Sequence, residues 1–127
     1  MNNLRMLLIF PLLIFLGGCF AAAVGGAVGA GSVVYYQGQL KTKEIASLEQ
    51  TWFAVVTTMD DMGFKIIEKQ KDRISAYLKA RTTEDKKVRI KLKYENETRT
   101  DMSVRVGIFG DEKISRLIVN KIHKKLY

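Results

Sequence analysis

Positively charged side chains alternate with apolar ones along three segments of the chain. Residues 74–81, 88–94 and 102–108 each alternate with period two, which is typical of strands that bury one face. Seven side chains would then share the open face: Tyr77, Lys79, Arg81, Arg89, Lys91, Lys93 and Arg105. Six of these seven are cationic, and such a field attracts phosphate groups on lipid headgroups, lipopolysaccharide or nucleic acid. The alternative is a solvated face whose lysines prevent edge-to-edge aggregation.

The sequence contains few residues that could support catalysis or bind a metal. One cysteine and one histidine exclude an intrachain disulfide and a metal centre built from several of either residue. We expect His123 to be solvated or paired with a helix dipole. Adjacent acidic residues, Asp60-Asp61 and Asp111-Glu112, do not share a helix face and predict no acid/base pair. The sequence therefore favours a non-enzymatic protein without cofactor or metal, and a small hydrolase with an unrecognised site is an alternative.

Length and charge divide the chain into three parts. Its 127 residues fit one domain, and 21 Lys+Arg against 13 Asp+Glu give a net charge of +8. Arg5 is the only charged residue before position 33, so residues 33–127 hold 20 basic and 13 acidic residues, a net charge of +7. An apolar start and a stretch of glycine and alanine precede this charged part.

The charged part begins with the patterns of a strand and a helix. We expect a strand over residues 33–43 with a bulge or bend at Gly38. Ser47 and Gln50 have the spacing of a capping box, and the apolar spacing that follows, including Trp52 in the core, predicts a helix that ends before Gly63.

The rest of the charged part predicts four strands and a second helix. The strands are residues 64–69 and the three alternating segments, and the helix follows Asp111. The order β-α-β-β-β-β-α indicates an α+β fold, a two-layer sandwich in which both helices cover one face of an antiparallel sheet.

Gly107, Gly110 and Asp111 connect the last strand to the last helix. Glycine permits a bend, and an aspartate at this position can cap the helix, so we interpret the segment as a structural corner. A functional site at this corner is the alternative.

The first 19 residues carry a targeting pattern. Arg5 precedes the apolar run 6–16, which spans about 16 Å as a helix and is too short to cross a bilayer comfortably. Leu16-Gly17-Gly18-Cys19 is similar to a bacterial lipobox, which implies cleavage before Cys19 and acylation of that residue. Two or more acyl chains would hold the protein stably at a membrane. We therefore expect a signal peptide at 1–18, the acylated Cys19 with a tether at 19–32, and one domain at 33–127.

Glycine and alanine dominate residues 20–31, which is typical of a flexible tether. The alternative is an uncut membrane span from Met6 to Tyr36. Such a span would associate with a second copy through Gly25 and Gly29, which stand four residues apart.

The segment Arg105-Val-Gly-Ile-Phe-Gly-Asp-Glu112 resembles the C-terminal part of an uncharacterised family of small bacterial lipoproteins, a domain of unknown function. Three further features are similar to that family: a lipobox followed by glycine and alanine, a strand of the Tyr36-Gln-Gly38 type, and a helix leading to a strand near Gly63. The resemblance covers nearly all of the mature chain and implies no catalytic residues.

These observations together predict a lipid-anchored protein of the bacterial cell envelope. Phe20 follows Cys19 where inner-membrane lipoproteins carry Asp, so we expect attachment to the outer membrane, facing the periplasm. The expected role is an interaction or structural module that meets anionic lipid, lipopolysaccharide or an envelope protein. Export disfavours nucleic acid as a partner.

Overall fold

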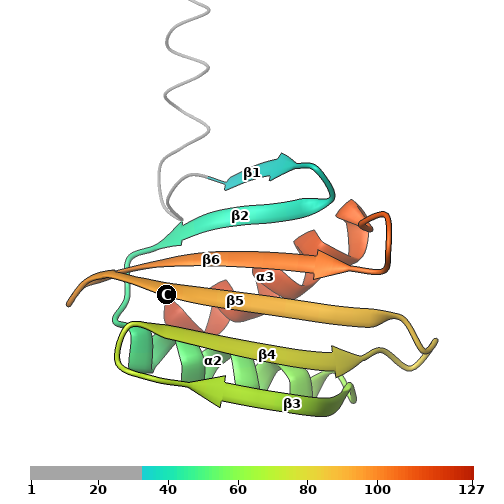
Figure 1. Cartoon of the computed structure of the whole chain (residues 1–127), viewed down its shortest axis with the longest axis horizontal. Coiled ribbons are helices and arrows are strands. Elements are labelled where there is room, and N and C mark those ends of the chain that lie inside the picture. The colour runs from blue at the N-terminus through green and yellow to red at the C-terminus, as the bar shows by residue number, and fades with distance from the viewer. Residues whose placement is uncertain (1–32) are drawn as a thin grey trace, which may run out of the picture.

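The computed structural model describes residues 33–127, which form an α+β fold of six strands and two helices (Figure 1). This confirms the predicted fold class. The elements are β1 (Val33–Tyr36), β2 (Gln39–Glu44), α2 (Leu48–Asp61), β3 (Lys65–Lys71), β4 (Ser75–Arg81), β5 (Lys87–Asn96), β6 (Arg99–Val106) and α3 (Glu112–Leu126). The predicted signal peptide, Cys19 and the tether lie outside the described residues.

All six strands form one antiparallel sheet in the order β1-β2-β6-β5-β4-β3. Strand β6 therefore lies between β2 and β5, although β2 and β6 are far apart in the sequence. Both helices pack on the same face of the sheet, as Figure 1 shows, and no helix of residues 33–127 lies on the opposite face. The sheet thus has one covered face and one open face.

The hydrophobic core lies between the helices and the covered face. Its fully buried side chains alternate along each strand and recur on one side of each helix: Leu40, Val55, Met59, Leu78, Ile90, Leu92, Met102, Val104, Ile118 and Ile122. The sheet, the core and both helix caps are contained within residues 33–127, so this part of the chain has the elements that a domain needs to fold by itself.

The segment predicted as one strand over residues 33–43 is instead a hairpin of β1 and β2. Gln37 and Gly38 both have positive φ, 51° and 79°, which is the backbone of a two-residue type I′ turn. Glycine at the second turn position supplies this conformation without strain. Gly38 therefore reverses the chain and does not bend a continuous strand.

Helix α2 begins and ends where the sequence predicts. Ser47 is the N-cap, its side chain accepts a hydrogen bond from the Gln50 backbone, and the reciprocal bond completes the capping box. Gly63 follows the C-cap with φ 70°. Trp52 is only half-buried at the margin of the core, whereas Thr51 and Thr58 are completely buried.

Neither helix of the described part is both long and apolar enough to cross a membrane. Residues 33–36, which the alternative span would include, form β1 and pair with β2. The span as proposed, reaching Tyr36, is therefore wrong at its C-terminal end, and residues 6–32 of it lie outside the described part.

Candidate functional site

Strand pairing brings the predicted cationic side chains together on the open face of the sheet. Lys79 of β4 lies opposite Arg89 of β5, and Arg89 lies opposite Arg105 of β6. Directly opposite residues in antiparallel strands are only about 4.5–5.5 Å apart between Cα atoms, and like charges there repel. The sheet therefore carries three cations in a row across β4, β5 and β6, and Arg89 has a cation on both sides. Glu68 of β3 lies opposite Lys79 at one end of this row.

The same face holds cations that the sequence analysis missed. Lys65 lies opposite Arg81, and Lys87 lies opposite Arg81 on its other side. Lys41 and Lys43 lie opposite Ser103 and Asp101, because β2 pairs with β6. The basic face, as we define it, consists of Lys41, Lys43, Lys65, Lys79, Arg81, Lys87, Arg89, Lys91, Lys93 and Arg105. The alternation within residues 39–44 could have identified Lys41 and Lys43. These two lysines are exposed between the buried residues Leu40, Thr42 and Glu44.

Few acidic groups neutralise the basic face. Arg81 Nη1 pairs with Asp85 Oδ1 at 3.0 Å. Lys43 Nζ lies 3.8 Å from Glu95 Oε2 and 4.0 Å from Asp101 Oδ1. Within residues 33–127, no ion pair is formed by five of the six predicted cations: Lys79, Arg89, Lys91, Lys93 and Arg105.

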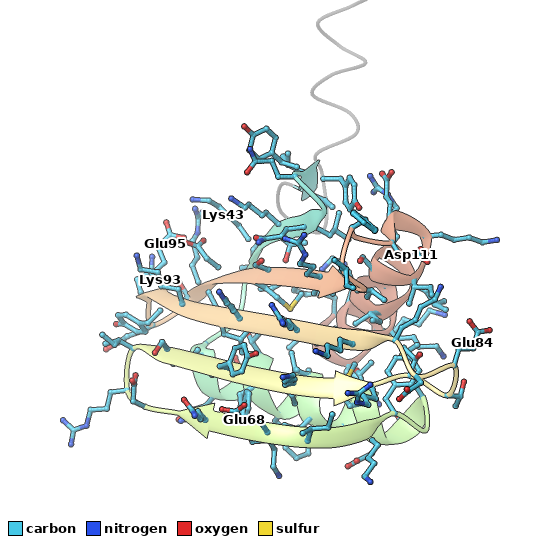
Figure 2. The ribbon with its side chains drawn as sticks, turned by 45° about the vertical axis from the view of Figure 1, so that its right-hand side comes forward. Lys43, Glu68, Glu84, Lys93, Glu95 and Asp111 are labelled. Carbon is cyan, nitrogen blue, oxygen red and sulfur yellow. The ribbon has the colours of Figure 1, made fainter. Side chains whose placement is uncertain are left out.

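The acidic residues labelled in Figure 2 lie toward the margins of the open face. Glu95 is at one end of the sheet, Glu84 and Asp111 are at the other, and Glu68 is on edge strand β3. The centre of the face is therefore left to the cations. Such an arrangement can hold phosphate or carboxylate groups of a second surface.

The corner between β6 and α3 has the geometry that its glycines and aspartate suggest. Gly107 and Gly110 have φ of 74° and 85°, and Asp111 is the N-cap, accepting a hydrogen bond from Ile114 N at 3.1 Å. That hydrogen bond, with an ion pair from Lys86, holds the pKa of Asp111 below its ordinary value. These contacts give the corner a structural role. Ile108 and Phe109 at its tip are 79% and 91% exposed.

A buried polar cluster on the covered side was not predicted. Glu44 of β2 is 0% exposed, and its carboxylate bonds His123 Nε2 at 2.8 Å and Thr42 Oγ1 at 2.5 Å. Tyr127 donates to the other carboxylate oxygen at 2.9 Å and accepts from Ile45 N at 2.8 Å. We expect from the sequence that His123 is solvated or paired with the helix dipole. In the structure it pairs with the Glu44 carboxylate, which β2 places beside it.

The surroundings of this cluster shift two pKa values. Burial raises the pKa of Glu44, but the hydrogen bonds from His123, Thr42 and Tyr127 outweigh burial, so that the pKa lies below its ordinary value of 4.5. Burial, with the nearby Glu44 carboxylate, raises the pKa of Tyr127 to about 12. The cluster joins the end of α3 to β2, and both carboxylate oxygens of Glu44 are hydrogen-bonded within it.

The remaining acidic candidates lie apart from the basic face. Asp60 and Asp61 are exposed at the end of α2, and Asp61 pairs with Lys125 of α3. In the part of the chain that the structure describes, no group of three His, Cys, Asp or Glu side chains could hold a metal ion.

A protein-family profile described as "Protein of unknown function (DUF3568)" matches residues 3–125. No curated protein matches the sequence.

Proposed function

Because the chain belongs to the DUF3568 family of unknown function, and its open face is strongly basic, we propose that it is a lipid-anchored envelope protein that binds anionic surfaces through that face. The observation that supports the proposal best is the row Lys79, Arg89, Arg105. Three like charges on neighbouring strands cost stability, and an anionic partner would offset that cost.

The proposed anchor is an acylated Cys19 after removal of residues 1–18. It would hold the domain beside membrane phosphates, where each cation near the surface contributes about 1 kcal/mol to binding. We propose attachment to the outer membrane with the domain in the periplasm, in keeping with Phe20 after Cys19. The role we propose is interaction or structure without catalysis, with anionic lipid, lipopolysaccharide or an envelope protein as the partner.

Vesicle binding by a charge variant tests the basic face. Changing Lys79, Arg89, Lys91 and Lys93 together to Gln removes four cations that have no ion pair within the described residues. Four contributions of about 1 kcal/mol each predict binding to anionic vesicles weaker by about a thousandfold. The measurement is co-sedimentation of residues 32–127 with phosphatidylglycerol vesicles, compared with neutral phosphatidylcholine vesicles.

A matched variant separates the position of the charges from their number. Lys69, Lys113, Lys121 and Lys124 are exposed, and none is on the basic face. Changing these four to Gln alters the net charge by the same amount. We expect a loss of no more than about tenfold, because charges farther than about 10 Å from the membrane are screened at 0.1 M salt. Equal losses in the two variants would contradict a role for the basic face.

Mass spectrometry of the protein isolated from bacterial membranes tests the anchor. A chain that begins at an acylated Cys19 is the expected result. An intact N-terminus at Met1 with an unmodified thiol would overturn the lipoprotein assignment and leave the basic face to be judged by vesicle binding alone.

A further inference from the structure

The open face contains a groove with a volume of about 1020 Å³. Its floor is formed where β6 contributes the short side chains Asp101 and Ser103, while longer side chains rise from the strands on either side. Val34, Tyr36 and Lys41 line one side, and Tyr77, Lys91 and Lys93 line the other, where the lining continues to β3 and the β3–β4 turn. A groove of this size is comparable to pockets that bind small molecules, about 300–1,000 Å³.

The walls of this groove are apolar as well as cationic. Val34 and Tyr36 are 55% and 57% exposed, and no other element of the described part covers them. Lys41 Nζ lies 5.9 Å from the centre of the Tyr36 ring, which places this ring beside the lysine on the open face. Lysine stems add further carbon surface, because their ammonium groups extend toward water. The groove therefore offers an apolar channel between charged rims.

The charge of the rims indicates an anionic occupant. Lys41, Lys91 and Lys93 form no ion pair among residues 33–127, and Lys43 has only the distant contacts to Glu95 and Asp101. Two acidic residues, Asp72 and Asp101, also line the groove, and one oxygen of Asp101 is buried without a hydrogen-bond partner in the described part. Cations at the rims thus exceed the acidic groups available to neutralise them.

The position of the groove on a face of the sheet favours a lipid over a peptide. Peptides that bind sheets gain affinity from main-chain hydrogen bonds at an exposed edge. The floor of this groove belongs to β5, β6 and β2, whose backbone groups already bond neighbouring strands. An acyl chain needs no hydrogen bonds, and the lysines can hold its anionic head group.

We propose that this groove binds one anionic lipid molecule, with an acyl chain along the apolar walls and the head group at the lysines. The inference rests on the proposed function, because a protein held at a membrane meets such lipids at high local concentration. The inference goes beyond the proposed function, because the groove would bind a single lipid molecule in addition to the association of the basic face with a charged surface.

The test uses a soluble short-chain lipid below its micelle concentration. Residues 32–127 are titrated with dihexanoyl-phosphatidylglycerol, whose phosphodiester carries one negative charge. Separately, they are titrated with glycerol 3-phosphate, whose phosphomonoester carries nearly two negative charges at pH 7 and which has no acyl chains. Calorimetry gives the affinities, and amide chemical shifts locate the binding. We expect the lipid to bind at least about tenfold more tightly than glycerol 3-phosphate, with shifts centred on Lys41, Lys91 and Ser103. Dihexanoyl-phosphatidylcholine, which carries no net charge, should bind more weakly than the anionic lipid.

Two double variants distinguish the groove from exposed apolar surface in general. Val34→Ser with Tyr36→Ser removes apolar wall without changing charge, and both side chains are more than half exposed, so the fold should persist. Ile108→Ser with Phe109→Ser is the matched control, since these exposed residues lie outside the groove. We expect the first variant to lose the tenfold preference for the lipid and the second to keep it. Circular dichroism establishes that each variant is folded.

The outcomes separate this inference from the proposed function. A V34S/Y36S protein that still binds anionic vesicles but no longer prefers the soluble lipid over glycerol 3-phosphate supports both. Equal binding of dihexanoyl-phosphatidylglycerol and glycerol 3-phosphate would overturn the groove while leaving surface binding intact. Tighter binding of an acidic peptide than of the lipid, with shifts along the edge of β1 or β3, would overturn the choice of a lipid.

Discussion

Glu44 is a carboxylate without solvent exposure, and its partners come from β2 and from the end of α3. A buried charge is costly unless it is paired and hydrogen-bonded, and both carboxylate oxygens meet this condition here. The cluster therefore fixes the last turn of α3 against the sheet.

The lowered pKa of Glu44 predicts how this contribution depends on pH. A carboxyl group whose pKa is lower in the folded state stabilises the protein above its unfolded pKa, and the contribution is lost as the pH falls through the folded value. Glu44→Gln should therefore lower the free energy of unfolding by about 1–3 kcal/mol at pH 7. The difference from wild type should shrink below pH 4.5, the ordinary value. Urea unfolding of both proteins at pH 7 and pH 3 measures this difference in free energy of unfolding. An equal difference at the two pH values would contradict the stabilising role of the ionised Glu44.

The sequence contained part of the information for this cluster. Glu44 continues the alternation of Leu40 and Thr42, which indicates that it faces the core. His123 could not be assigned to it, because β2 and α3 lie far apart in the chain and only the tertiary fold brings them together. The buried Thr51 and Thr58 were missed for a different reason. Their hydroxyls donate to the carbonyls of Ser47 and Ala54 in the same helix, so burial leaves neither hydroxyl unpaired.

At the scale of elements, the β1–β2 turn packs against the corner that precedes α3. A Cβ atom added at Gly110 would lie 2.4 Å from Gly38 Cα and 2.5 Å from Gly38 O. These are backbone atoms, which cannot move aside as the end of a side chain would. The two glycines therefore allow two connections, far apart in sequence, to touch through their backbones.

This contact predicts different costs for two glycine substitutions. Gly110→Ala should destabilise the domain by about 3 kcal/mol or more, because it combines an unfavourable φ with a backbone clash. Gly107→Ala is the matched control: its φ is also positive, at 74°, but an added Cβ meets nothing within 4 Å. Its cost should be about 1–2 kcal/mol. Thermal unfolding measures both, and equal costs would show that the contact with Gly38 is unimportant.

The elements were largely predictable because their signals are local. Capping by Ser47 and the alternation of residues 75–81 and 88–92 each depend on a few adjacent residues. The hairpin at Gly38 was missed because Gln-Gly is a weaker turn signal than Asn-Gly, the common pair for this turn. Ile74 and Tyr94 were expected to face the core and are 65% and 39% exposed. They lie where the regular pairing of β4 and β5 ends, and the register shifts after Tyr94.

At the scale of the whole molecule, the fold separates apolar and charged surfaces. The two helices cover one face of the sheet, and the other face collects cations from β2, β4, β5 and β6 as well as from β3 (Figures 1 and 2). The sequence predicted six of these cations from alternation alone. It could not predict which residues lie side by side, because the pairing of β2 with β6 depends on the tertiary fold. The groove between Tyr36 and Tyr77 follows from that pairing.

The most direct test of the basic face is its response to salt. Residues 32–127 are mixed with phosphatidylglycerol vesicles or with vesicles containing lipopolysaccharide, and the bound fraction is measured by co-sedimentation. The salt series runs from about 10 mM to about 1 M, over which the Debye length falls from roughly 30 Å to roughly 3 Å. The account predicts strong binding at low salt, a steep loss as salt rises, and none to neutral vesicles. Absence of binding to anionic vesicles at the lowest salt would contradict it.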